Sequence, residues 1–146
     1  MAAFDRIAAA AAPLAVAVSA LLFLQWPLRQ VPGGWAIEAN DLAQWLFALY
    51  VAVAVAHAQR RRTHLVARPD LAGGRWRRAG AAFAVLPWSL FLVATATAPT
   101  LRSLAALERF PETLDPGYFM IRVALMLLGA LLAAQAVADL RAAWRG

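Results

Sequence analysis

The residues able to do acid–base or metal chemistry are few, and they lie at the ends of long apolar stretches. The histidines are His57 and His64, and the chain has no cysteine. Glu38 and Asp41 precede one apolar stretch, and Asp139 ends another. Haem iron held inside a helical bundle normally takes histidines from facing helices. No such pair, no Ser/His/Asp set and no glycine-rich phosphate loop can be assembled. We therefore expect no enzyme activity, no catalytic residue, no cofactor and no metal site.

Any functional residue must be positioned by the four apolar stretches that make up most of the chain. They cover residues 7–28, 42–59, 79–101 and 118–139. The first three carry no charged residue, whereas the fourth carries Arg122 near its start and Asp139 at its end. A bilayer core about 30 Å thick is crossed by about 20 apolar residues, and a helix satisfies their backbone internally. The sequence predicts an all-α membrane protein with four transmembrane helices in a single domain, residues 1–146. The first stretch exceeds the 7–15-residue apolar region of a signal peptide, so we expect it to be retained.

Arginine is distributed unevenly between the links. Residues 60–78, between the second and third stretches, hold seven arginines against one aspartate, whereas the other two links hold three arginines and five acids. Short arginine-rich loops stay in the cytoplasm, so both termini and a short interfacial basic loop in residues 60–78 are predicted to be cytoplasmic. The expected topology-setting and headgroup-contacting residues are Arg60, Arg61, Arg62, His64, Arg68, Arg75, Arg77 and Arg78.

Composition agrees with a membrane protein whose positive charge meets lipid. The chain is 63% hydrophobic, and its net charge of +6 comes from arginine alone. The basic residues cluster between two spans without an aromatic binding platform, which favours anionic headgroups over nucleic acid as the partner. Alanine recurs at four-residue spacing in three of the spans, as in Ala48, Ala52 and Ala56 or Ala130, Ala134 and Ala138. Such rows let membrane helices approach closely.

Four residues near the predicted outer ends of the spans are candidate helix-end anchors or partner contacts: Trp35, Glu38, Asp41 and Arg122. Tryptophan suits the headgroup level, and an acid in a first helical turn complements the helix dipole. Glu38 could equally meet a basic group on a partner protein. Arg122 lies about one turn inside the fourth span, where it could extend outward to the headgroups or pair with an acid on a neighbouring chain.

Two stretches carry a distinctive pattern. The first is Gly-Gly-Trp-Ala-Ile-Glu at residues 33–38, and the second is Arg-Arg-Arg-Thr-His-Leu at residues 60–65. Together they resemble the small membrane subunit of tripartite ATP-independent periplasmic (TRAP) transporters. The family shares the length, the four spans, a tryptophan shortly before an acid, and a basic turn followed by histidine and an aliphatic residue. The family often has a second acid where this chain has Ile37, and a basic residue where it has Asp41. It also often has an acid where this chain has Arg68, with Asp70 nearby. These departures indicate a divergent subfamily.

The resemblance implies a non-catalytic scaffold subunit of a sodium-gradient-driven symporter for organic acid uptake. It would pack against a large multi-span permease subunit in the bacterial inner membrane and work with a periplasmic substrate-binding protein. The alternative is a self-contained oligomeric channel or small exporter, with Gln25, Gln44, Thr95, Thr97 and Gln135 facing a shared pore. A carboxylate inside a span would favour that alternative, and none of the four spans contains one away from its ends.

Overall fold

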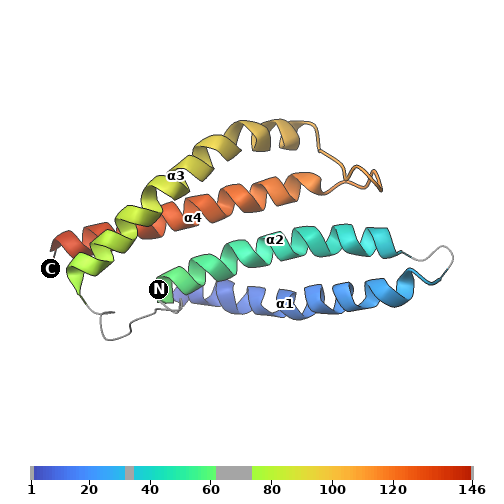
Figure 1. Ribbon diagram of the computed structural model, residues 1–146, viewed down its shortest axis with the longest axis horizontal. Coiled ribbons are helices and arrows are strands. Elements are labelled where there is room, and N and C mark those ends of the chain that lie inside the picture. The colour runs from blue at the N-terminus through green and yellow to red at the C-terminus, as the bar shows by residue number, and fades with distance from the viewer. Residues whose placement is uncertain (1, 32–34, 62–73, 146) are drawn as a thin grey trace.

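The computed structural model describes residues 2–31, 35–61 and 74–145. Over these ranges it contains four helices, α1 (Ala2–Leu28), α2 (Ala36–Arg61), α3 (Arg75–Ala105) and α4 (Tyr118–Arg145) (Figure 1). Each of the four includes a segment long and apolar enough to cross a membrane. The same ranges form no strand, only an isolated bridge between Arg109 and Pro116. The predicted fold class, an all-α protein with four membrane-spanning helices, is confirmed.

The helices extend beyond the apolar stretches that predict them. Helix α2 begins six residues before position 42, because the Ala39 N–H already bonds the Trp35 carbonyl at 2.9 Å. Its early polar residues are satisfied in place, as Asn40 accepts a hydrogen bond from the Gln25 amide at 3.1 Å. Helix α3 has 31 residues, about 46 Å at 1.5 Å per residue, so it exceeds the hydrocarbon core. Hydropathy finds the lipid-crossing part of a helix and misses its polar ends.

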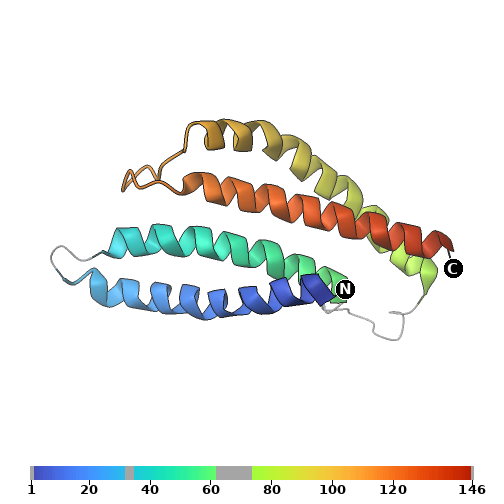
Figure 2. The ribbon, with the colours of Figure 1, turned by 180° about the vertical axis from the view of Figure 1, so that it is seen from behind.

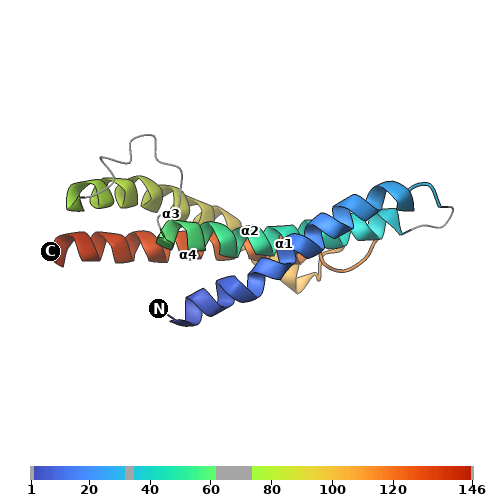
Figure 3. The same ribbon diagram turned by 90° about the horizontal axis from the view of Figure 1, so that it is seen from below.

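The four helices lie side by side in one layer, in the order α1, α2, α4, α3. Over the described residues α1 packs only on α2, α2 also packs on α4, and α3 packs only on α4. Figures 1 and 2 show this order from opposite sides. Seen from below, α1 crosses α2 obliquely, and the two diverge toward the beginning of α1 (Figure 3). The chain therefore forms an open layer rather than a closed four-helix bundle.

Small residues line the contacts between the helices. Ala52 and Ala124 are each 1% exposed and Ala136 is fully buried. Gly129 lies at a close approach of α4 to α3, since a Cβ placed there would lie 3.0 Å from Val93 Cγ2. Without a hydrophobic effect between helices in lipid, close backbone packing is a main source of attraction. The second half of the α2 alanine row is thus used inside the chain, whereas Ala130, Ala134 and Ala138 on α4 are exposed.

The two ends of the layer differ in charge. At the end where α1 and α3 begin and α2 and α4 finish, here called the basic end, the described charges are seven arginines and Asp139. They are Arg6, Arg60, Arg61, Arg75, Arg77, Arg141 and Arg145. The opposite end, here called the loop end, carries the segments that join α1 to α2 and α3 to α4 (Figure 1). It has four arginines and five acids. Both termini therefore lie at the same end of the layer as the basic helix ends.

Candidate functional site

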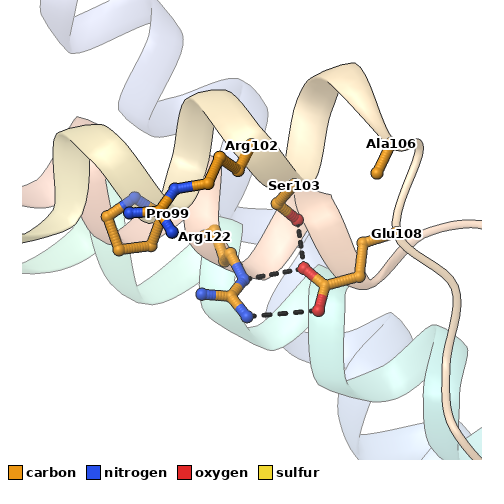
Figure 4. Close-up of a pocket in the computed structure, with 6 residues that line it drawn as sticks. All are labelled: Pro99, Arg102, Ser103, Ala106, Glu108 and Arg122. Atoms are coloured by element: carbon orange, nitrogen blue, oxygen red, sulfur yellow. Dashed lines mark hydrogen bonds and ion pairs between the residues drawn. The ribbon is translucent and has the colours of Figure 1, made fainter.

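A charged cluster joins α3, α4 and the segment between them at the loop end. Arg122, on the second turn of α4, makes a two-point contact with Glu108, which follows α3. Its Nε lies 2.9 Å from Glu108 Oε2, and its Nη2 donates to Oε1 at 3.2 Å. The Ser103 hydroxyl of α3 donates to the same carboxylate (Figure 4). The pair closes one wall of an open cavity of about 350 Å³, which is also lined by Pro99 and Arg102.

Local contacts favour the ionised form of Glu108 and orient the Arg122 guanidinium. The Ser103 hydroxyl and then the Arg122 guanidinium hold the pKa of Glu108 below its usual value of 4.5. The Arg122 guanidinium also lies over the Tyr118 ring, 5.5 Å from its centroid, a cation–π contact. The side chains of Glu108 and Arg122 are each 35% exposed, so water screens their attraction. The ion pair therefore adds little to the free energy of folding, and its main effect is to position the two segments. The cluster ties the start of α4 to the end of α3.

The segment between α3 and α4 is folded back on itself. The Phe110 N–H bonds the Asp115 carbonyl at 2.9 Å, and the Leu114 N–H bonds the Phe110 carbonyl at 2.9 Å. The Phe110 ring is 4% exposed and meets Tyr118 edge-on at 5.7 Å. Gly117 has a φ of 147°, and a Cβ there would lie 3.1 Å from the Phe110 ring. Glycine is required at this turn both for its backbone conformation and for space.

Asp41 links this segment to α2. Asp41 is 7% exposed, and its carboxylate accepts a hydrogen bond of 2.7 Å from the Thr113 hydroxyl. The same hydroxyl accepts a bond from the Asp115 N–H at 3.2 Å. A buried carboxylate without such a partner would carry a large desolvation cost. Together with the charged cluster, this contact fastens the 106–117 segment to three helices.

The structure divides the four candidate anchor or contact residues into two pairs. Asp41 and Arg122 are occupied by Thr113 and Glu108 of the same chain. Trp35 is 75% exposed immediately before α2, and Glu38 is exposed in the first turn of that helix. Pairing of Arg122 within its own chain was not among the sequence-based alternatives. The signal was an acid and an arginine on either side of a short link containing Pro111 and Gly117, which allows the chain to reverse.

The expected headgroup-contacting residues are described in part. Arg60 and Arg61 end α2, and Arg75 and Arg77 begin α3. Arg75 lies over the Trp76 ring at 5.2 Å. Arg62, His64 and Arg68 lie outside the described residues, as does most of the predicted basic interfacial loop, and the side chain of Arg78 is likewise not described.

Over the described ranges, no three His, Cys, Asp or Glu residues come close enough to hold a metal ion. Four hydroxyls inside the spans bond to carbonyls of their own helix: Ser19 to Ala15, Ser89 to Leu86, Thr95 to Phe91, and Thr97 to Val93. The Thr100 hydroxyl instead donates to the Arg122 carbonyl of α4 at 3.4 Å. The described residues form a loop end held by side-chain contacts and a layer whose two broad faces are not covered by other described parts of the chain.

Comparison with known proteins adds no assignment. No protein-family model, curated protein or solved structure matches the chain.

Proposed function

We propose that this protein is the small, non-catalytic scaffold subunit of a TRAP-type transporter for an organic anion, with a carboxylate as its substrate class. The observation that carries the proposal is the open layer. Over the described residues α1 and α3 each pack on one neighbour only, so both broad faces of four membrane-spanning helices stay free of this chain. Apolar helices arranged in this way offer a large surface to another membrane protein.

The interior of the layer supports a scaffold rather than a transport pathway. Coupling to an ion gradient needs a site inside the membrane, built from carboxylates, broken helices or half-helix ends. The acidic residues of the four helices lie near helix ends, at Asp5, Glu38, Asp41 and Asp139. Of the polar residues that a shared pore would use, Gln25 bonds Asn40, while Thr95 and Thr97 bond their own helix. These contacts weigh against the channel or exporter.

In this assignment the large permease subunit binds sodium and the substrate, and a periplasmic protein delivers the anion. The small subunit sits in the bacterial inner membrane with both termini in the cytoplasm and widens the fixed part of the permease. The braced 106–117 segment suits this role, because Arg122, Ser103 and Asp41 tie it to α4, α3 and α2. A scaffold that lies beside the mobile part of the permease must keep its own helices at constant spacing.

Reconstitution tests the proposal. Liposomes containing this chain alone should show no sodium-driven uptake of any carboxylate, and adding the large subunit and the binding protein should restore uptake. Gradient-driven flux through the purified chain alone would disprove the scaffold assignment. Equal uptake by the large subunit and binding protein without this chain would disprove it as well.

A matched pair of charge variants tests whether the exposed side of α2 meets a partner. Glu38 is exposed in the first turn of α2, and Glu112 is an exposed acid on the 106–117 segment at the same end. Glu38→Gln should reduce recovery of the complex with the large subunit severalfold, whereas Glu112→Gln should not. If both variants assemble and transport like the parent, Glu38 is only a helix-end residue.

A further inference from the structure

A groove between α1 and α2 opens at the basic end of the layer. Its volume is about 420 Å³. On the α1 side the wall consists of four alanines, Ala8, Ala9, Ala11 and Ala12, and on the α2 side it runs from Tyr50 to Arg61. The helices diverge here, as Figure 3 shows, and alanine side chains are too short to fill the space between them. The groove is thus a consequence of small residues at a widening helix crossing.

The length of the groove matches half a bilayer. Tyr50 and Arg61 are eleven residues apart, which is about 16 Å along a helix axis. Half of a hydrocarbon core about 30 Å thick is about 15 Å. A transmembrane helix of a partner would cross the whole thickness, whereas an acyl chain of one leaflet ends near the midplane. The dimensions therefore suit a lipid better than a helix.

The chemistry along the groove changes from apolar to cationic. Val53 and Ala54 face the alanine wall in the deeper part, and His57 and Arg61 line the part near the basic end. That end of the sequence, with the two termini and residues 60–78, carries ten arginines and three aspartates. A groove of this order of size is typical of small-molecule sites, and basic pockets between membrane helices suit anionic headgroups.

We infer that this groove binds one anionic phospholipid from the leaflet at the basic end. Its phosphate would lie against Arg61 and His57, and an acyl chain would lie along the four alanines toward Tyr50. A larger groove of about 610 Å³ lies between α2 and α4, but it opens near Tyr118 and Arg122 at the loop end, where acids outnumber arginines five to four. The charge difference favours the α1–α2 groove over this one for an anion. A cavity between α2 and α4 that includes Arg60 is smaller, about 230 Å³. The inference does not depend on the proposed transport role.

Native mass spectrometry of the purified full-length chain in detergent tests this site. The probes are phosphatidylglycerol, phosphatidylcholine and inorganic phosphate at equal concentration. One phosphatidylglycerol should be retained at least about fivefold more than phosphatidylcholine, and inorganic phosphate should not compete with it. Retention of phosphate without an acyl chain, or equal retention of both lipids, would overturn the inference.

Two variants separate the headgroup contact from the acyl-chain contact. Arg61→Gln should abolish most of the preference for phosphatidylglycerol, and Arg145→Gln, an exposed arginine at the same end, should not. Ala12→Leu fills the groove and should reduce retention of the lipid severalfold, whereas Ala130→Leu on the exposed side of α4 should leave it unchanged. Circular dichroism confirms that each variant is folded.

The control variants also define failure. Equal losses in Arg61→Gln and Arg145→Gln would mean diffuse attraction to a basic surface instead of a site. If Ala12→Leu keeps the lipid, the groove does not hold an acyl chain and the inference is wrong. The same holds if the purified chain proves to be a dimer and Ala12→Leu makes it a monomer.

Discussion

The close contact between α3 and α4 at Gly129 gives a quantitative test of the packing. Gly129 on α4 faces α3, and an added Cβ would lie 3.0 Å from Val93 Cγ2, 3.4 Å from Leu92 Cβ and 3.4 Å from the Ser89 carbonyl oxygen. The 3.0 Å separation is tighter than ordinary van der Waals contact, and the two of 3.4 Å are at its lower edge, so in Gly129→Ala the Val93 side chain or its helix must move by a few tenths of an ångström. Overpacking of this kind costs about 1–3 kcal/mol.

A second glycine removes the effect of helix propensity from the comparison. Gly80 lies in α3, and a Cβ there would meet nothing within 4 Å. Replacing a helical glycine with alanine stabilises by about 0.5–1 kcal/mol when space is available. Gly80→Ala should therefore raise stability by about that amount, and Gly129→Ala should fall about 1–3 kcal/mol below it, because the propensity gain is common to both.

Equilibrium unfolding in mixed micelles, followed by circular dichroism, measures the two free energies of unfolding under one condition. The expected gap corresponds to about a fivefold to 160-fold difference in the unfolding constant. If Gly129→Ala proves as stabilising as Gly80→Ala, then α3 and α4 are not held at the close distance that their small residues allow, and the account of the core is refuted.

Two further predictions concern the loop end, and a third compares the loop end with the basic end. Thr113→Val should destabilise the protein by about 1–3 kcal/mol, because it leaves the buried Asp41 carboxylate without this hydrogen bond. Thr95→Val, at an exposed position of α3, should change the stability by no more than about 0.5 kcal/mol. Thermal melting compares the two variants. Folding lowers the pKa of Glu108, so the stability that its carboxylate contributes is present above about pH 4.5 and is lost as the pH falls through the lowered pKa. Glu108→Gln should therefore flatten the acid side of a plot of melting temperature against pH. Glu112→Gln should leave that side of the plot as it is in the parent protein. The chain has no cysteine, so single cysteines at Glu112 and Trp144 can report sidedness: an impermeant thiol reagent should label position 112 and spare position 144 on intact cells, and the opposite pattern would reverse the proposed topology.

The sequence alone determined the fold class and the location of the spans. Uninterrupted apolar runs in residues 7–28 and 79–101 leave helices as the structure that satisfies their backbone in lipid. The segregation of arginine to the termini and residues 60–78 likewise follows from composition, and the structure places the described members of that set at one end of the layer. Hydropathy and charge depend on residue type, so they can be read without coordinates.

Only the tertiary structure decided which side chains meet. Four apolar helices can form a closed bundle or an open layer with the same hydropathy, and the choice depends on which small residues face which neighbour, as at Gly129. The partner of Arg122 depends on a chain reversal at Gly117, and the partner of Asp41 is distant in sequence, at Thr113. Such contacts arise between segments whose separation is set by packing, and local patterns carry no record of that distance. The α1–α2 groove also depends on the tertiary structure. Alanine rows predict that two helices pack closely, but α1 and α2 cross obliquely and diverge, which leaves a groove between them.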